Sequence, residues 1–134
     1  MKVVIDTNVF VSGVFFKGPP YEILKAWRAG RFELVISQEI FAEYQRVGDD
    51  LLQDYPSVEL QPALNFIKQN IELVNAKPFA ESVCSDPDDD KFIACALAAK
   101  SKIIVSGDKH LLNVSGYQEI EVMKPREFVD KYLA

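Results

Sequence analysis

The sequence contains few cysteines, a single histidine and no long hydrophobic run. Its two cysteines, Cys84 and Cys95, form no CxxC pair, which argues against a disulfide scaffold or a zinc ribbon and fits a reducing cytosol. His110 alone excludes a site built from several histidines, and we expect this residue in a loop. The longest apolar runs, such as residues 92–99, are far shorter than the roughly 20 residues of a membrane-spanning helix. We therefore expect a cytoplasmic protein with no signal peptide and no membrane contact.

An excess of positive charge is also missing. The chain has 15 lysines and arginines against 20 aspartates and glutamates, so its net charge is −5. Proteins that coat nucleic acids generally are basic, because neutralising phosphates dominates their affinity. This chain is therefore not a general coating protein. It would bind nucleic acid locally, through a patch formed by Lys17, Lys91 and Lys109, or through a metal ion held by its own carboxylates.

The remaining composition is that of a folded protein. A length of 134 residues with 49% apolar and 26% charged residues predicts a single domain over residues 1–134. Short apolar runs alternate with helical patterns, which predicts βαβ units around a mostly parallel sheet. We expect a turn-rich segment around Gly13, Gly18 and Pro19–Pro20. The expected strands are 3–5, 32–36, 71–74, 103–105 and 120–123, and the expected helices are 21–29, 37–47, 62–69, 87–100 and 127–133.

Two acidic residues follow predicted strands. Asp6 comes directly after strand 3–5, and Asp108 follows strand 103–105 after Ser106 and Gly107. Ligands of parallel sheets bind beyond the carboxyl ends of the strands, so both carboxylates lie where a site is expected. Aspartate is also common as a turn or cap residue, and either residue alone is a weak signal.

Four further acids surround Pro87 at the start of the predicted helix 87–100. Asp86 suits the N-cap, and the helix dipole favours acids in the first turn, but this explains one or two of them rather than all four. Asp90 lies one turn before the apolar Ile93, from where it can reach the rim of the sheet. Helical geometry ranks Asp89 no lower than Asp90, so Asp86 and Asp89 remain alternatives to Asp90.

Glu43 is the remaining acid at the edge of an apolar stripe. It lies three residues after Ile40 and four before Val47 on the helix expected at 37–47. A glutamate in such a place is often a surface residue with a buried stem, so its weight comes from combination with the other acids.

Convergence of Asp6, Glu43, Asp90 and Asp108 would create strong repulsion. Two carboxylates about 5 Å apart repel by roughly 3 kcal/mol at an effective dielectric near 20. Four of them cannot all stay ionised without a cation or a bound proton. Oxygen ligands without a histidine cluster favour Mg²⁺ or Mn²⁺ over zinc, and these ions suit a phosphodiester substrate.

These pieces together resemble the PIN-domain family of nucleases. The matching segments are Asp6-Thr7-Asn8, Glu43, Asp90 within DPDDDKFIACALA, and Ser106-Gly107-Asp108, in the family's order across nearly the whole chain. Within the family, the DPDDDKF and SGDKHLL segments look most like the VapC-like toxin components of prokaryotic toxin–antitoxin pairs. The resemblance implies a three-layer α/β/α fold whose parallel sheet has the order 3-2-1-4-5.

The resemblance also implies a function and roles for single residues. It implies an Mg²⁺- or Mn²⁺-dependent endoribonuclease, often a homodimer, that a partner antitoxin inhibits. Asp6, Asp90 and Asp108 would be metal ligands or outer-shell ligands, and Glu43 would bind the metal or position the attacking water. Hydrogen bonds would orient these carboxylates, and the resemblance assigns them to Thr7, Asn8 and Ser106.

Other α/β families fit these residues less well. A phosphotransfer receiver domain needs an aspartate after its third strand, where this chain has Asn75. A phosphatase of the haloacid-dehalogenase type needs a second aspartate at position 8, which is Asn8 here. The main alternative is a PIN-like module that binds RNA or protein without catalysis and uses its acids only as helix caps.

Overall fold

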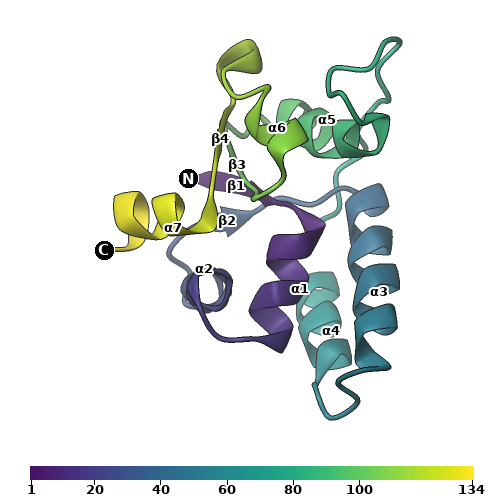
Figure 1. Ribbon diagram of the computed structural model, residues 1–134, viewed down its shortest axis with the longest axis vertical. Helices are drawn as coiled ribbons and strands as arrows, with labels where there is room; N and C mark the ends of the chain where they lie inside the picture. The colour runs from purple at the N-terminus through teal and green to yellow at the C-terminus, as the bar shows by residue number, and fades with distance from the viewer.

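The computed structural model describes residues 1–134 and places four parallel strands at its centre (Figure 1). The strand order is β2-β1-β3-β4, and helices flank the sheet in the expected three-layer α/β/α arrangement. The strands are β1 (Lys2–Ile5), β2 (Glu33–Leu34), β3 (Ile103–Val105) and β4 (Glu121–Met123). The helices are α1 (Thr7–Phe15), α2 (Pro19–Arg28), α3 (Gln38–Leu52), α4 (Leu60–Asn70), η1 (Pro87–Asp89), α5 (Asp90–Ala99), α6 (Lys109–Leu112), η2 (Tyr117–Glu119), α7 (Pro125–Phe128) and η3 (Val129–Leu133).

Strands β1 and β3 form the buried centre of the sheet and end side by side. Ile5 pairs with Val105 in parallel register, and both residues are fully buried. The backbone N–H of Asp6 continues the ladder by donating to the Val105 carbonyl at 3.0 Å, and that of Ser106 donates to Met123 at 3.0 Å. The residues that follow the two strands therefore emerge together at the carboxyl edge of the sheet.

Helix α1 occupies the first part of the turn-rich segment expected after the first strand, and only the turn at Gly18, whose φ is 123°, remains between α1 and α2. Asp6 begins α1 by accepting a hydrogen bond from the Val9 N–H at 2.9 Å. Gly13, expected in a turn, lies inside this helix. A Cβ atom added there would lie 2.6 Å from Leu24 Cδ1 and 2.7 Å from the Pro20 carbonyl oxygen. The glycine thus permits α1 and α2 to cross closely, which sequence periodicity does not reveal.

The strand expected at residues 71–74 does not form. This segment makes one isolated parallel bridge, between Ser37 and Val74, in which the Val74 N–H donates to Ile36 at 2.9 Å. The bridge lies just beyond β2, where the order 3-2-1-4-5 places the outer strand. The segment runs beside the sheet without a regular ladder, so the sheet has four strands rather than five.

The other elements follow the expected order with shifted ends. The helix expected at 87–100 is divided into the 3₁₀ turn η1 and the α-helix α5, and α5 packs against β1 and β3. His110 lies in the short helix α6 rather than in a loop. None of the helices combines the length and the apolar character needed to cross a bilayer.

Candidate active site

The carboxylate of Asp6 is buried at the carboxyl end of β1. Its side chain is held from two directions, because Oδ1 caps α1 and Oδ2 accepts a hydrogen bond from the Ser106 hydroxyl. The residue is only 4% exposed. Burial raises the pKa of Asp6 to about 6, although the hydrogen bonds from Ser106 and Val9 act in the opposite direction. A carboxylate held this firmly with a raised pKa is poised to gain a proton or a cation.

Ser106 links the acids that follow the two central strands. Its fully buried hydroxyl donates to Asp6 and accepts a hydrogen bond from the Asp108 N–H at 2.9 Å. Asp108 then caps α6, with Oδ1 accepting from the His110 N–H at 2.7 Å. One hydroxyl group thus fixes both strand-end acids relative to each other.

Asp89 contributes a carboxylate oxygen with no partner. Its Oδ2 atom is buried and makes no hydrogen bond. Burial is the main reason that the pKa of Asp89 is raised to about 6, and the negative charges of Asp108, Asp86 and Asp6 raise it further, whereas His110 lowers it. Asp89 therefore shares an electrostatic environment with both strand-end acids. An unpartnered buried oxygen there is a feature that a bound cation would satisfy.

Asp90 is held by backbone groups of the loop before η1. Its Oδ1 atom accepts hydrogen bonds from the backbone N–H groups of Cys84, at 2.8 Å, and Val83, at 3.1 Å. Burial alone would raise the pKa of Asp90, but these hydrogen bonds, with that of Ser82, hold it below its usual value. Asp90 thus fastens the loop before η1 to the start of α5. The spacing to Ile93 that favoured Asp90 could not distinguish it from Asp89.

Glu43 reaches the site through α3 and is bound at both oxygens. Thr7 donates to Oε1, and the Lys91 ammonium lies 2.7 Å from Oε2. The adjacent Tyr44 is fully buried and donates its hydroxyl hydrogen bond to the carbonyl of Ile5, which fixes α3 against the end of β1. Sequence spacing alone indicates no site role for Tyr44 or for this ion pair. The position of Tyr44 on the apolar stripe of α3 indicates a buried residue but not its hydrogen bond to Ile5.

A small cavity opens beside the strand-end acids. It has a volume of about 330 Å³ and includes the exposed Asn8 in its lining. The side chain of Asn8 makes no hydrogen bond to any of the acids, so it is available to a ligand in the cavity. The lining consists of Asp6, Asn8, Val9, Ser12, Pro20, Gly107, Asp108 and Pro125.

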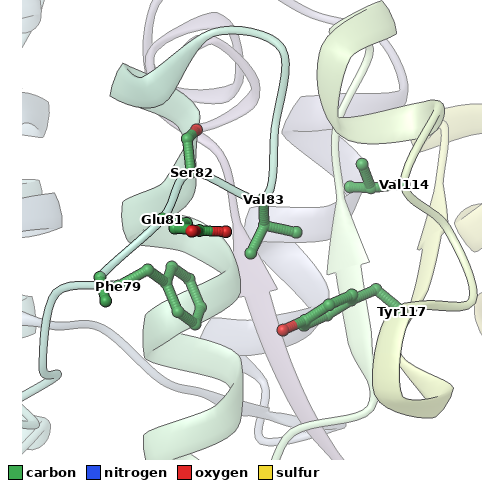
Figure 2. Close-up of a pocket in the computed structure, with 7 residues that line it drawn as sticks. Phe79, Glu81, Ser82, Val83, Val114 and Tyr117 are labelled. Carbon is green, nitrogen blue, oxygen red and sulfur yellow. The ribbon is translucent and has the colours of Figure 1, made fainter.

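A larger cavity, of about 580 Å³, has none of these acids in its lining. Figure 2 shows the residues that line it. Phe79 and Val83, from the loop before η1, face Val114 and Tyr117 across it. Glu81 is the only charged residue in its lining, and none of the candidate acids contributes to it. This cavity lacks the groups that phosphodiester chemistry needs, so the candidate active site is the acidic edge of the sheet.

The acids of this edge fit a hard divalent cation with an incomplete protein shell. No group of three or more Asp, Glu, His or Cys side chains is gathered closely enough to enclose a metal ion. Mg²⁺ commonly takes only one or two carboxylates and fills its other positions with water and substrate phosphate. The free Oδ2 of Asp89 and the raised pKa values of Asp6 and Asp89 match that partial set of ligands.

Comparison with known proteins identifies the family of the chain. The sequence profile of the PIN domain matches residues 2–110, which include every acid described above. The chain is also 29% identical, over 150 aligned positions, to the protein named Uncharacterized protein MJ1680 of Methanocaldococcus jannaschii. That alignment covers 98% of this chain and 92% of the archaeal protein.

Proposed function

The chain belongs to the PIN domain family, whose members are generally metal-dependent nucleases, and we propose that it is an Mg²⁺- or Mn²⁺-dependent endoribonuclease. The observation that carries the proposal is the unpartnered Oδ2 atom of Asp89, whose carboxylate feels the negative charges of the two strand-end acids that Ser106 links. A buried carboxylate oxygen without a partner, under the influence of other negative charges, is costly unless a proton or a cation neutralises it. The nuclease fold supports the cation as the functional choice.

Asp6 and Asp89 would hold the ion directly, and Asp108 would hold a water molecule bound to it. When bound, a divalent ion supplies positive charge to the phosphoryl group and lowers the pKa of a water nucleophile. Ser106 keeps Asp6 oriented through its hydrogen bond, and the cap of α6 keeps Asp108 in place. Asp90, the ligand expected from the sequence, would act through its hold on the loop before η1. Exchange of roles between Asp89 and Asp90 is a testable alternative.

The remaining polar groups would act on water and on the RNA. Glu43, held by Thr7 and Lys91, would position the attacking water and accept its proton. Asn8 lies exposed in the cavity wall, where its amide would donate a hydrogen bond to a phosphate oxygen of the substrate. Of the three lysines expected to form a basic patch, Lys91 is enclosed by its pair with Glu43, so the exposed Lys17 and Lys109 would attract RNA locally. The net charge of −5 provides no general attraction.

We place this activity in a toxin–antitoxin pair. Residues 1–134 would form one PIN-like domain that works in the cytoplasm as a homodimer, without contact to membranes, and a partner antitoxin would inhibit its cleavage of RNA. The support is the resemblance of the DPDDDKF and SGDKHLL segments to VapC-like toxins. Co-purification with the product of a neighbouring small reading frame would test the pairing.

A second candidate is a PIN-like module that binds RNA or protein without cleaving it. The observation that favours it is the engagement of the acids by the protein itself: Glu43 pairs with Lys91, Asp90 binds backbone N–H groups, and no three acids enclose a cation site. Binding of RNA that is unaffected by EDTA and unaccompanied by cleavage would favour this reading.

Cleavage of a fluorescently labelled single-stranded RNA tests the enzyme directly. We expect Mn²⁺ or Mg²⁺ to stimulate cleavage, and EDTA or the Asp6→Asn substitution to abolish it. Asn keeps the helix cap of α1 but removes the negative charge. Asp88→Asn is the matched control, because Asp88 is an exposed neighbour in the same acidic run. Equal cleavage by the Asp6→Asn variant and the native protein would refute the proposed role.

A further inference from the structure

A largely buried ion pair lies beside the acidic edge of the sheet. The ammonium of Lys91 is 2.7 Å from Glu43 Oε2, and the two side chains are only 10% and 19% exposed. The same ammonium donates to the carbonyl oxygen of Asp88 at 2.6 Å. A lysine that is enclosed to this extent is costly unless its charge is compensated, so Lys91 is fixed in place rather than mobile on the surface.

Lys91 binds the oxygen of Glu43 that a second metal ion would need. Thr7 holds Oε1 and Lys91 holds Oε2, so Glu43 has no carboxylate oxygen free of a protein partner. Thr7, which holds Oε1, directly follows Asp6, so the ammonium of Lys91 reaches the acidic edge of the sheet through Glu43. A second divalent ion on Glu43 would have to displace this ammonium.

We propose that Lys91 takes the position of the second cation, so that the site binds one divalent ion and Glu43 stays outside its coordination. The inference rests on the proposed metal-dependent function and deepens it. Two-metal nucleases use a second ion to compensate charge on the reacting oxygens. Here a side chain provides a fixed positive charge instead. Lys91 is thus a positioning residue that sets the metal stoichiometry through Glu43.

Titration calorimetry with MnCl₂ and no RNA present tests this inference without measuring activity. We expect about one ion per native chain and about two per Lys91→Met chain, because the freed Glu43 becomes a ligand. Lys91→Arg keeps the charge and should restore one ion. The double variant Glu43→Gln/Lys91→Met loses the freed carboxylate and should also bind one ion.

Arg46→Met is the matched control for removal of a cation near Glu43. Arg46 lies 3.8 Å from the same oxygen, but its side chain is 67% exposed, so we expect its loss to leave the count at one. Circular dichroism verifies folding, and Lys91→Gln replaces Lys91→Met if the latter does not fold.

The outcomes separate this inference from the function on which it rests. Two ions on the native protein, or one ion on the Lys91→Met variant, would overturn the role of Lys91 and leave a metal-dependent nuclease intact. Failure of the native protein to bind Mn²⁺ at all would overturn both. A rise from one ion to two, reversed in the double variant, supports the assignment.

Discussion

At the scale of single residues, Asp89 and Asp90 are neighbours with opposite environments. Asp89 has a buried oxygen without a partner, whereas Asp90 accepts two backbone hydrogen bonds. We expect Asp89→Ala to lower metal-dependent cleavage on the order of 100-fold and to leave the free energy of unfolding unchanged or higher. Asp90→Ala should lower the free energy of unfolding by about 1–3 kcal/mol, because it leaves backbone donors unpaired.

The two measurements are cleavage of labelled RNA and urea denaturation of both variants. Asp88→Ala is the control, since that side chain is exposed. The opposite result would be an Asp90→Ala variant that is as stable as the native protein but does not cleave RNA, together with a fully active Asp89→Ala variant. That result would make Asp90 the metal ligand, as expected from the sequence.

The raised pKa of Asp6 predicts a particular dependence of stability on pH. In the metal-free protein this pKa rises from 3.8 to about 6, so between these values the folded state keeps a proton that the unfolded state has lost. The free energy of unfolding should therefore fall as pH rises from about 4 to 6, by about 3 kcal/mol at most from Asp6, and change little above that.

Urea denaturation at several pH values in EDTA measures this slope. Asp89 titrates in the same direction, so the contribution of Asp6 is the difference between the native protein and Asp6→Asn. Parallel curves for the two proteins would show that Asp6 titrates normally.

At the scale of secondary-structure elements, the crossing of α1 and α2 depends on one glycine. Alanine usually stabilises a helix interior by about 0.5–1 kcal/mol relative to glycine. At Gly13 we expect the reverse, a loss of about 1–3 kcal/mol, because the new methyl group would meet the carbonyl of Pro20, which cannot rotate away. Thermal or urea denaturation measures the change.

Gly48 of α3 provides the matched comparison. A Cβ atom added there would meet only the side chain of Leu60, at 2.7 Å from Cδ2. The ends of a leucine side chain can shift, so Gly48→Ala should cost less than Gly13→Ala. An equal or larger loss at Gly48 would show that the backbone contact of Gly13 is not the decisive one.

The elements also differ in how far the sequence predicted them. Continuous apolar runs identified the two central strands, and the helix expected at 37–47 is present as α3, where the Ser37 hydroxyl accepts from the Ile40 N–H at 3.2 Å. Helix α1 was missed because Gly13 was interpreted as a turn residue. The segment 71–74 was over-assigned, since its apolar pattern could not show that only Val74 bridges to the sheet.

At the scale of the whole molecule, a bound divalent ion should stabilise the fold. Binding only to the folded state adds about 2.7 kcal/mol when the ion is at 100 times its dissociation constant, which corresponds to a rise in Tm on the order of 5–10 °C. We expect this rise with MnCl₂ for the native protein and not for Asp6→Asn.

Differential scanning fluorimetry measures the shift, with NaCl at matched ionic strength as the control for screening of the net charge of −5. An equal shift with NaCl, or in Asp6→Asn, would mean that the ion acts by screening rather than at the acidic edge.

The sequence by itself determined the alternation of strands and helices, the layered α/β class and the acids that follow the central strands, because each of these depends on residues close together in the chain. It also determined the family, because the order of short motifs along the chain is enough to identify it. Only the tertiary structure decided the partners of those acids. The Lys91–Glu43 pair joins residues 48 positions apart, and the Ser106–Asp6 bond joins residues 100 apart. Helical periodicity cannot choose between the adjacent Asp89 and Asp90, since that choice depends on which neighbours the folded chain brings to each carboxylate.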